Sequence, residues 1–369
     1  MGRVVEQGSW LVKRMNARRA VLAVALCGAL VVSCGDSTRD QAASQIAASR
    51  TSQPTTSTID STTPTTKSVE SAGADAGETG VPVTSPPAST TTSSPGPKRA
   101  PAGPFNGAGV WIDVYEWSPS STDGNPGVTP DQVAHMAEVG MKTLYIQSAR
   151  TSRDADIADP ERFKEFVDAA HLNGMEVVSW YLPEHVDEQK DLRRILSPLD
   201  LGVDGLSVDF ESGKVEDVAL RNERAIKLVR DATDLAGDVP VGAITFAPQA
   251  LDRYEPDTWP FFPWKEISEV SDVVVPMAYW TIYRDEFPGS EDPVAYTDEA
   301  LSLLRERIGD DVPVHNAGGL LQDSDAAEVG AATAEARRHG VIGISMYSWS
   351  GYQPGQMDAM NEPDEPGDA

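Results

Sequence analysis

Short apolar runs alternate with segments of helical pattern along residues 105–352. Each run has the length and the content of β-branched and aromatic residues that favour a strand. The runs cover residues 109–115, 142–149, 176–182, 205–211, 240–247, 272–280, 313–319 and 341–349. Because strand and helix alternate, the pattern favours a parallel sheet, and eight repeats favour its closure into a (β/α)8 barrel of the TIM type, an α/β fold.

Helix signals occur between these strands. Residues 129–132 have the pattern of a capping box with proline at the first helical position, and Asp159 with Pro160 opens a second helix. Further helices are predicted over 215–236, 298–308 and 325–339. Only the short stretch 354–360 remains after the eighth strand, so we expect an incomplete last helix.

The N-terminus has the features of an export signal. A positively charged segment, residues 13–19, precedes an apolar run over 20–32 that is too short for a comfortable transmembrane helix. The run ends in Val-Val-Ser-Cys, which resembles the lipobox of bacterial lipoproteins, where the cysteine is acylated and becomes the mature N-terminus. The resemblance implies a signal peptide over 1–33, a lipid anchor on Cys34 and a location on the outer face of the cell membrane. An uncleaved anchor or ordinary secretion is the alternative.

Composition divides the rest of the chain into three parts. Residues 34–103 are rich in Ser, Thr, Pro, Ala and Gly and poor in apolar residues, which predicts a disordered tether. The predicted barrel domain covers 104–355, a common size for a single barrel, and 356–369 form an acidic tail.

Charge and residue types argue against several kinds of partner and cofactor. The 369-residue chain has a formal net charge of -27, which argues against binding to nucleic acid. Its 5 histidines are scattered, its 2 cysteines lie near the N-terminus, and no H-E-x-x-H or C-x-x-C occurs, so we expect no metal and no cofactor. The chain also lacks a G-x-S-x-G elbow and a P-loop, which disfavours serine-hydrolase and phosphate chemistry.

The fourth predicted strand carries two acids. In the stretch VDGLSVDFES, at 203–212, alternation places Ser207, Asp209 and Glu211 on one face and three apolar residues on the other. In a barrel the apolar face suits the helix layer, so the acidic face points inward. Glu211 then stands at the C-terminal end of the strand, where barrel enzymes have their active sites. The alternative is that the two acids cap a following helix or pair with an arginine such as Arg150.

This strand resembles the signature of family 18 glycoside hydrolases, the chitinase-like group, which carry D-G-x-D-x-D-x-E on the fourth barrel strand. Residues 204–211 read Asp-Gly-Leu-Ser-Val-Asp-Phe-Glu. That family also has M-x-Y-D on strand six, similar to Met-Ala-Tyr-Trp at 277–280, and a tryptophan on strand eight, similar to Trp349. Two positions depart from the pattern, because Ser207 stands in place of the middle aspartate and Trp280 in place of the aspartate on strand six.

The resemblance implies hydrolysis of glycans that contain N-acetylhexosamine, such as chitin-like or cell-wall material. Glu211 would be the general acid that protonates the glycosidic oxygen. Asp209 would orient the substrate's own N-acetyl group as that group attacks the anomeric carbon, and Tyr279 would hydrogen-bond it. This substrate-assisted route needs no protein nucleophile and retains configuration.

Further residues near the strand ends are expected to bind the substrate through aromatic faces and polar groups. The predicted substrate-binding residues are Asp113, Gln147, Trp180, Tyr181, Ser207, Met277, Trp280 and Trp349. Asp113 would also supply a second carboxylate if the enzyme used a conventional acid/base pair. Two other functions stay open at this point: a non-catalytic carbohydrate-binding barrel on the cell surface, and a barrel glycosidase of another family with inverting chemistry.

Overall fold

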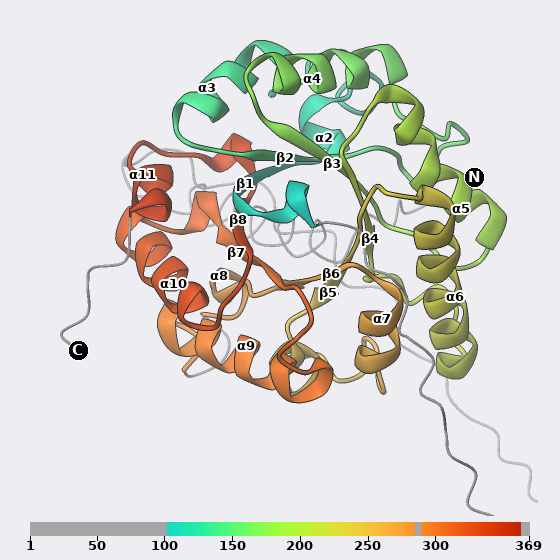
Figure 1. The fold of residues 1–369 in the computed structure, drawn as a ribbon, viewed down its shortest axis with the longest axis vertical. Coiled ribbons are helices and arrows are strands. Elements are labelled where there is room, and N and C mark those ends of the chain that lie inside the picture. Colours follow the sequence, from blue (N-terminus) through green and yellow to red (C-terminus); the bar gives the residue numbers. More distant parts are fainter. Residues whose placement is uncertain (1–101, 285–288, 363–369) are drawn as a thin grey trace, which may run out of the picture. The chain divides into compact units, whose positions relative to one another are not determined.

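The computed structural model of the chain describes residues 102–284 and 289–362. Eight parallel strands close into a barrel in chain order, and helices surround it, which confirms the predicted (β/α)8 fold (Figure 1). The predicted signal peptide 1–33, with Cys34, lies outside the described residues, as does nearly all of the predicted tether. Within the described ranges, no helix has both the length and the apolar character needed to cross a membrane.

All eight predicted strands are present, and most are shorter than predicted because their last residues turn into the loops of the barrel rim. The strands are β1 Gly107–Ile112, β2 Thr143–Gln147, β3 Glu176–Tyr181, β4 Gly205–Asp209, β5 Val241–Phe246, β6 Val273–Met277, β7 His315–Leu320 and β8 Gly343–Tyr347. The pairing of β1 with β8, from Gly107 opposite Gly343, closes the sheet.

The described helices include all the long ones that the sequence predicts. They are α2 Val114–Trp117, α3 Val133–Glu138, α4 Pro160–Leu172, α5 Glu188–Leu196, α6 Val218–Ala236, α7 Trp264–Val270, α8 Trp280–Tyr283, α9 Pro293–Ile308, α10 Ala326–Arg338 and α11 Gln356–Asn361. The predicted capping box at 129–132 is wrong, because the Thr129 side chain makes no capping bond and a 3-10 turn leads into α3. Capping boxes instead begin α2 at Asp113 and α10 at Asp325.

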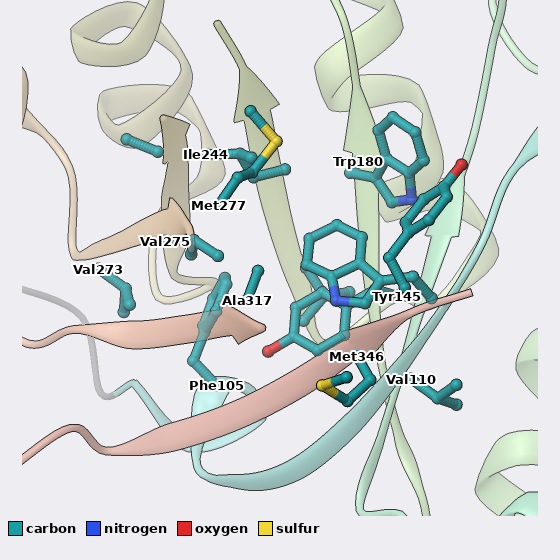
Figure 2. Packing of buried hydrophobic residues seen from close by; sticks show 14 of the residues in the cluster. Phe105, Val110, Tyr145, Trp180, Ile244, Val273, Val275, Met277, Ala317 and Met346 are labelled. Carbon is teal, nitrogen blue, oxygen red and sulfur yellow. The ribbon is translucent and has the colours of Figure 1, made fainter. Parts of the chain in front are cut away.

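Large side chains fill the interior of the barrel (Figure 2). Trp111 stacks on Tyr145 with ring centroids 4.3 Å apart, and Trp180 meets Trp111 edge-on at 5.8 Å. Phe105, from the turn before β1, is fully buried and packs against Tyr145 and against His315 at the first position of β7. This packing fills the N-terminal end of the barrel in the described part of the chain.

The last helix is short, as expected, but it belongs to the barrel. Helix α11 packs along α10 and buries Met357 and Met360 (Figure 1). Gln356 is also buried and donates from Nε2 to the carbonyl oxygens of Leu321 and Ser324 at 2.8 Å. The folded domain therefore extends to Asn361, beyond the predicted boundary at residue 355.

Candidate active site

The alternation predicted for β4 is present. On its outward side, Phe210 lies among helix-layer rings, stacked on His185 at 5.9 Å and edge-on to Trp259 at 6.0 Å. On the inward side, a Cβ added at Gly242 of the adjacent strand would come within 2.6 Å of Ser207 Oγ and 2.7 Å of the Phe105 ring. Because Phe105 lies inside the barrel, the face that carries Ser207 is the inward face.

Asp209 and Glu211 stand above Ser207 on this inward face, at the C-terminal end of the barrel. Asp209 is the last residue of β4, Glu211 follows it, and both are at least nine-tenths buried. Burial raises the pKa of the Asp209 carboxyl well above its usual value, and the nearby Glu211 raises it further. The Asp209 Oδ1 atom has no hydrogen-bond partner among the described residues. The raised pKa favours the protonated form of Asp209.

Tyr279 from the loop after β6 joins these two acids. Its side chain is buried, and its pKa is raised well above the ordinary value, first by burial and then by Asp209 and Glu211. The phenol therefore keeps its proton and can donate a hydrogen bond to a ligand beside the carboxyl pair. The structure thus brings together the three residues predicted to be catalytic.

Tyr347, which we did not predict as a site residue, also faces this group. It is the last residue of β8, its ring lies 6.4 Å from that of Tyr279, and its hydroxyl donates to Asp113 Oδ2 at 2.6 Å. Asp113 follows β1 directly and begins α2, accepting from the backbone N–H of Tyr115 at 2.7 Å. The alternation of β8 places Tyr347 inward, and that signal was available in the sequence.

Glu116 lies beside Asp113 at the rim of the barrel, and we did not predict it as a site residue either. Its Oε2 accepts from the backbone N–H of Asp113 at 2.9 Å, and its Oε1 accepts from the hydroxyls of Ser348 and Ser350. Burial, with the nearby Asp113, raises the pKa of Glu116 to about 7. The loops after β1 and β8 are therefore joined through a carboxyl group that titrates near neutrality.

Three other predicted binding residues lie at or next to the C-terminal ends of their strands. Trp180 points into the barrel (Figure 2), and its Nε1 is buried with no hydrogen-bond partner among the described residues. Met277 ends β6 two residues before Tyr279 and also lies in the packed interior (Figure 2). Gln147 has a structural contact, because its Oε1 accepts from the backbone N–H of Val114 at 3.1 Å and holds α2 in place.

Two further predicted binding residues, Tyr181 and Trp280, are buried against neighbouring elements. Tyr181 neighbours Trp180 on β3 and therefore faces outward, where its hydroxyl donates to Asp191 at 2.8 Å and accepts from Arg194 at 2.9 Å. Trp280 is fully buried, and a Cβ added at Gly319 of β7 would come within 2.8 Å of its ring. Both side chains are buried in the structure, and their role in substrate binding stays a prediction.

Ser207 and Trp349 are the last two of the predicted binding residues. Ser207 is buried two residues before Asp209 on β4, on the Phe105 side. Trp349 begins a 3-10 turn after β8, which ends the alternation of the strand there. It stacks on Tyr352 at 4.7 Å, and its Nε1 donates to Gln132 Oε1 at 3.0 Å, on the α3 side of the barrel. Tyr347 is the strand-eight aromatic whose ring lies beside that of Tyr279.

One group of described residues has the spacing of metal ligands, away from this site. His339 Nε2 lies 3.0 Å from Asp298 Oδ1 and 3.3 Å from Glu335 Oε1. His339 follows α10 directly and precedes β8, so the group lies at the N-terminal end of the barrel. Arg338 forms an ion pair with Glu335, and we interpret the cluster as a charge network between α9 and α10.

No protein-family model matches this sequence, and no protein of curated function matches it. Solved structures share the fold. The spore cortex-lytic enzyme SleL of Bacillus cereus is similar with a TM-score of 0.54 at 12% identity, over 69% of this chain and 73% of that one. SleL of Bacillus megaterium QM B1551 gives 0.52 at 10% identity, over 72% and 75%. A class V chitinase of Pseudomonas fluorescens Pf-5 gives 0.50 at 11% identity, over 69% and 98%. The chain therefore has the barrel fold of chitinase-like and cortex-lytic glycoside hydrolases.

Proposed function

We propose that the protein is a glycoside hydrolase that cleaves glycans containing N-acetylhexosamine and retains configuration at the anomeric carbon. The observation that carries this proposal is the meeting of Asp209, Glu211 and Tyr279 at the C-terminal end of the barrel. Each of the three is buried, and the electrostatic effect of each acid reaches the tyrosine. A barrel enzyme acts at this end of its strands.

Glu211 gives its proton to the glycosidic oxygen, and the bond to the leaving sugar breaks. The carbonyl oxygen of the substrate's own N-acetyl group forms the new bond to the anomeric carbon, so no protein nucleophile is required. Tyr279 donates a hydrogen bond to that acetamido group. Asp209 accepts a hydrogen bond from the N–H of the same group and stabilises the positive charge that develops on it. Water then attacks the anomeric carbon from the face that the leaving sugar has left, and the bond to the acetamido oxygen breaks. Glu211 takes the proton of that water, which restores the acid.

Replacement of the acid tests this proposal. Glu211→Gln should lower the release of reducing ends from N-acetylglucosamine oligomers or cell-wall glycan by at least about 100-fold, since general acids contribute that much or more. Binding of the same oligomers should persist. Glu216→Gln is the matched control, because Glu216 is an exposed carboxylate on the loop that follows β4. Equal activity of the Glu211 variant and wild type would refute the assignment.

A carbohydrate-binding barrel without catalysis is the second candidate. One observation favours it: the inward residue below Asp209 is Ser207, whose hydroxyl has no hydrogen-bond partner among the described residues. An acid at position 207 could share a proton with Asp209, whereas the serine at that position cannot. Wild-type protein that binds the oligomers and never cleaves them would favour this candidate over the hydrolase.

We propose further that the barrel is held at the outer face of the cell membrane through a lipid on Cys34. The proposal rests on the charged segment, the short apolar run and the lipobox-like residues before that cysteine. The Ser/Thr/Pro-rich segment up to residue 103 would let the barrel reach glycan at some distance from the membrane.

A further inference from the structure

Two tyrosine hydroxyls lie at the C-terminal end of the barrel, and their hydrogen bonding differs. Tyr347, the last residue of β8, has its ring 6.4 Å from that of Tyr279, which follows β6. Both side chains are more than nine-tenths buried. The proposed reaction uses the hydroxyl of Tyr279, and the hydroxyl of Tyr347 has no role in it.

The proton of the Tyr347 hydroxyl is engaged by Asp113. The hydroxyl donates to Asp113 Oδ2 at 2.6 Å, a short distance that is typical of a hydrogen bond to a carboxylate. Burial raises the pKa of Tyr347 well above its ordinary value, and Asp113 and Glu116 raise it further. The phenol therefore keeps its proton, and that proton points at the carboxylate. Because only lone pairs remain on the phenol oxygen, Tyr347 can accept a hydrogen bond from a ligand but cannot donate one.

Asp113 is held in place by hydrogen bonds of its own. Its Oδ1 accepts from the backbone N–H of Tyr115 at 2.7 Å, at the start of α2, which leaves Oδ2 directed at Tyr347. The backbone N–H of Asp113 donates to Glu116 Oε2 at 2.9 Å, and Glu116 Oε1 accepts from the hydroxyl of Ser348, the residue after Tyr347. The loops after β1 and β8 are thus joined on both sides of the Asp113–Tyr347 bond, so the direction of this bond is set before a ligand binds.

Tyr279 has the opposite hydrogen-bonding character. Its pKa is also raised, first by burial and then by Asp209 and Glu211, so it keeps its proton. Within residues 102–284 and 289–362, its hydroxyl has no hydrogen-bond partner, so the proton is available to a ligand. A donor phenol and an acceptor phenol therefore lie side by side, and a ligand that satisfies both must itself carry an acceptor and a donor.

A pyranose with an N-acetyl group carries both kinds of group. In the proposed reaction, its acetamido group accepts a hydrogen bond from Tyr279, and the N–H of that group is bound by Asp209. The donors that remain on the same sugar are its ring hydroxyls. A hydroxyl is therefore the group of this sugar that matches the acceptor oxygen of Tyr347.

We propose that Tyr347 accepts a hydrogen bond from a ring hydroxyl of the sugar whose N-acetyl group contacts Tyr279, with Asp113 as the positioning residue that holds Tyr347 as an acceptor. The inference rests on the proposed hydrolase function and narrows its substrate, because that sugar must carry the hydroxyl unsubstituted. A sugar without this hydroxyl leaves the buried phenol oxygen unpaired, and a site built around a hydrogen bond discriminates against a ligand that cannot form it.

Binding is measured by calorimetry in Glu211→Gln protein with methyl N-acetyl-β-glucosaminide and its 3-deoxy, 4-deoxy and 6-deoxy analogues. One of these analogues should bind about five- to tenfold more weakly than the parent sugar, since it lacks the hydroxyl. Adding Tyr347→Phe should weaken the parent by a similar factor and abolish the difference between the parent and that analogue. Tyr296→Phe is the matched control, because Tyr296 is a buried tyrosine on α9 whose hydroxyl has no partner among the described residues. It should preserve the difference.

Asp113→Asn tests the positioning role. The single oxygen of asparagine is required by the backbone N–H of Tyr115, so its amide group faces Tyr347 and donates to the phenol oxygen. Tyr347 then turns its own proton toward the ligand. This variant should therefore bind the parent sugar as weakly as Tyr347→Phe does and lose the discrimination against the same analogue. Its stability to urea should stay near that of the parent protein, because asparagine caps a helix as well as aspartate does.

The possible outcomes separate this inference from the proposed function. Equal binding of all four sugars, a difference that persists in Tyr347→Phe protein, or no binding of the parent sugar at millimolar concentration would overturn the acceptor role of Tyr347. Full discrimination in Asp113→Asn protein would overturn the positioning role of Asp113. Discrimination that depends on Tyr347, in a protein whose wild type cleaves no glycan, would support the inference while refuting the hydrolase. Cleavage of N-acetylglucosamine oligomers by Tyr347→Phe at the wild-type kcat/KM would leave the hydrolase standing and refute the inference.

Discussion

The packing of Phe105 under the barrel makes a coupled pair of substitutions informative. Phe105 has no exposed surface, and its ring contacts those of Tyr145 and His315. Phe105→Ala should therefore lower the free energy of unfolding by about 3–5 kcal/mol, through lost burial and the cavity left behind. Gly242→Ala perturbs the same contact from β5, since its new Cβ would lie 2.7 Å from the Phe105 ring.

The two effects should not add. Alone, Gly242→Ala forces overpacking worth about 1–3 kcal/mol, offset in part by about 0.5 kcal/mol from a less flexible unfolded chain. In the Phe105→Ala background the ring atoms are gone, and the nearest remaining atom is Ser207 Oγ, which can rotate away. The added methyl group then fills part of the cavity, so its cost should fall to about zero. We expect a coupling energy of about 1–2 kcal/mol.

Urea denaturation followed by tryptophan fluorescence measures all four proteins of this cycle. The midpoint should shift to lower urea for each single variant, with m unchanged, and the double variant should match Phe105→Ala alone. Binding of N-acetylglucosamine oligomers by the folded variants should stay near that of wild type, because the contact lies at the opposite end of the barrel from Asp209. Strict additivity of the two single losses would refute the placement of Phe105 against Gly242.

Two further predictions concern the acidic rim and the N-terminus. The pKa of Glu116 rises from 4.5 to about 7 on folding, so the folded state holds a proton that the unfolded state has lost, and stability should fall as pH rises between these values. Glu116→Gln should remove that fall, and parallel stability curves for both proteins would contradict it. Cys34→Ala should abolish labelling by radioactive palmitate and move the protein out of the membrane fraction, whereas unchanged labelling would exclude lipid on this cysteine.

The sequence by itself determined the architecture and the central pair of acids. Apolar runs at regular spacing gave all eight strands, because a buried parallel strand must be apolar over several residues wherever it lies. The alternation in β4 placed Asp209 and Glu211 inward, since side chains in a strand point to opposite faces by covalent geometry alone. The role of Tyr279 was predicted from a resemblance to a family motif, and its position beside the acids depends on the closure of the barrel.

Only the tertiary structure decided which other residues share the site. Tyr181 and Trp280 have the aromatic character of sugar-binding residues, but Tyr181 faces α5 and Trp280 fills the space left by Gly319. Trp349 was assigned by its position after β8, and the chain there enters a 3-10 turn, in which the period of two no longer holds. Glu116 joins the site through contacts with Ser348, more than 200 residues away. Contacts of that kind depend on which loops the closed barrel brings together, and local sequence patterns do not predict them.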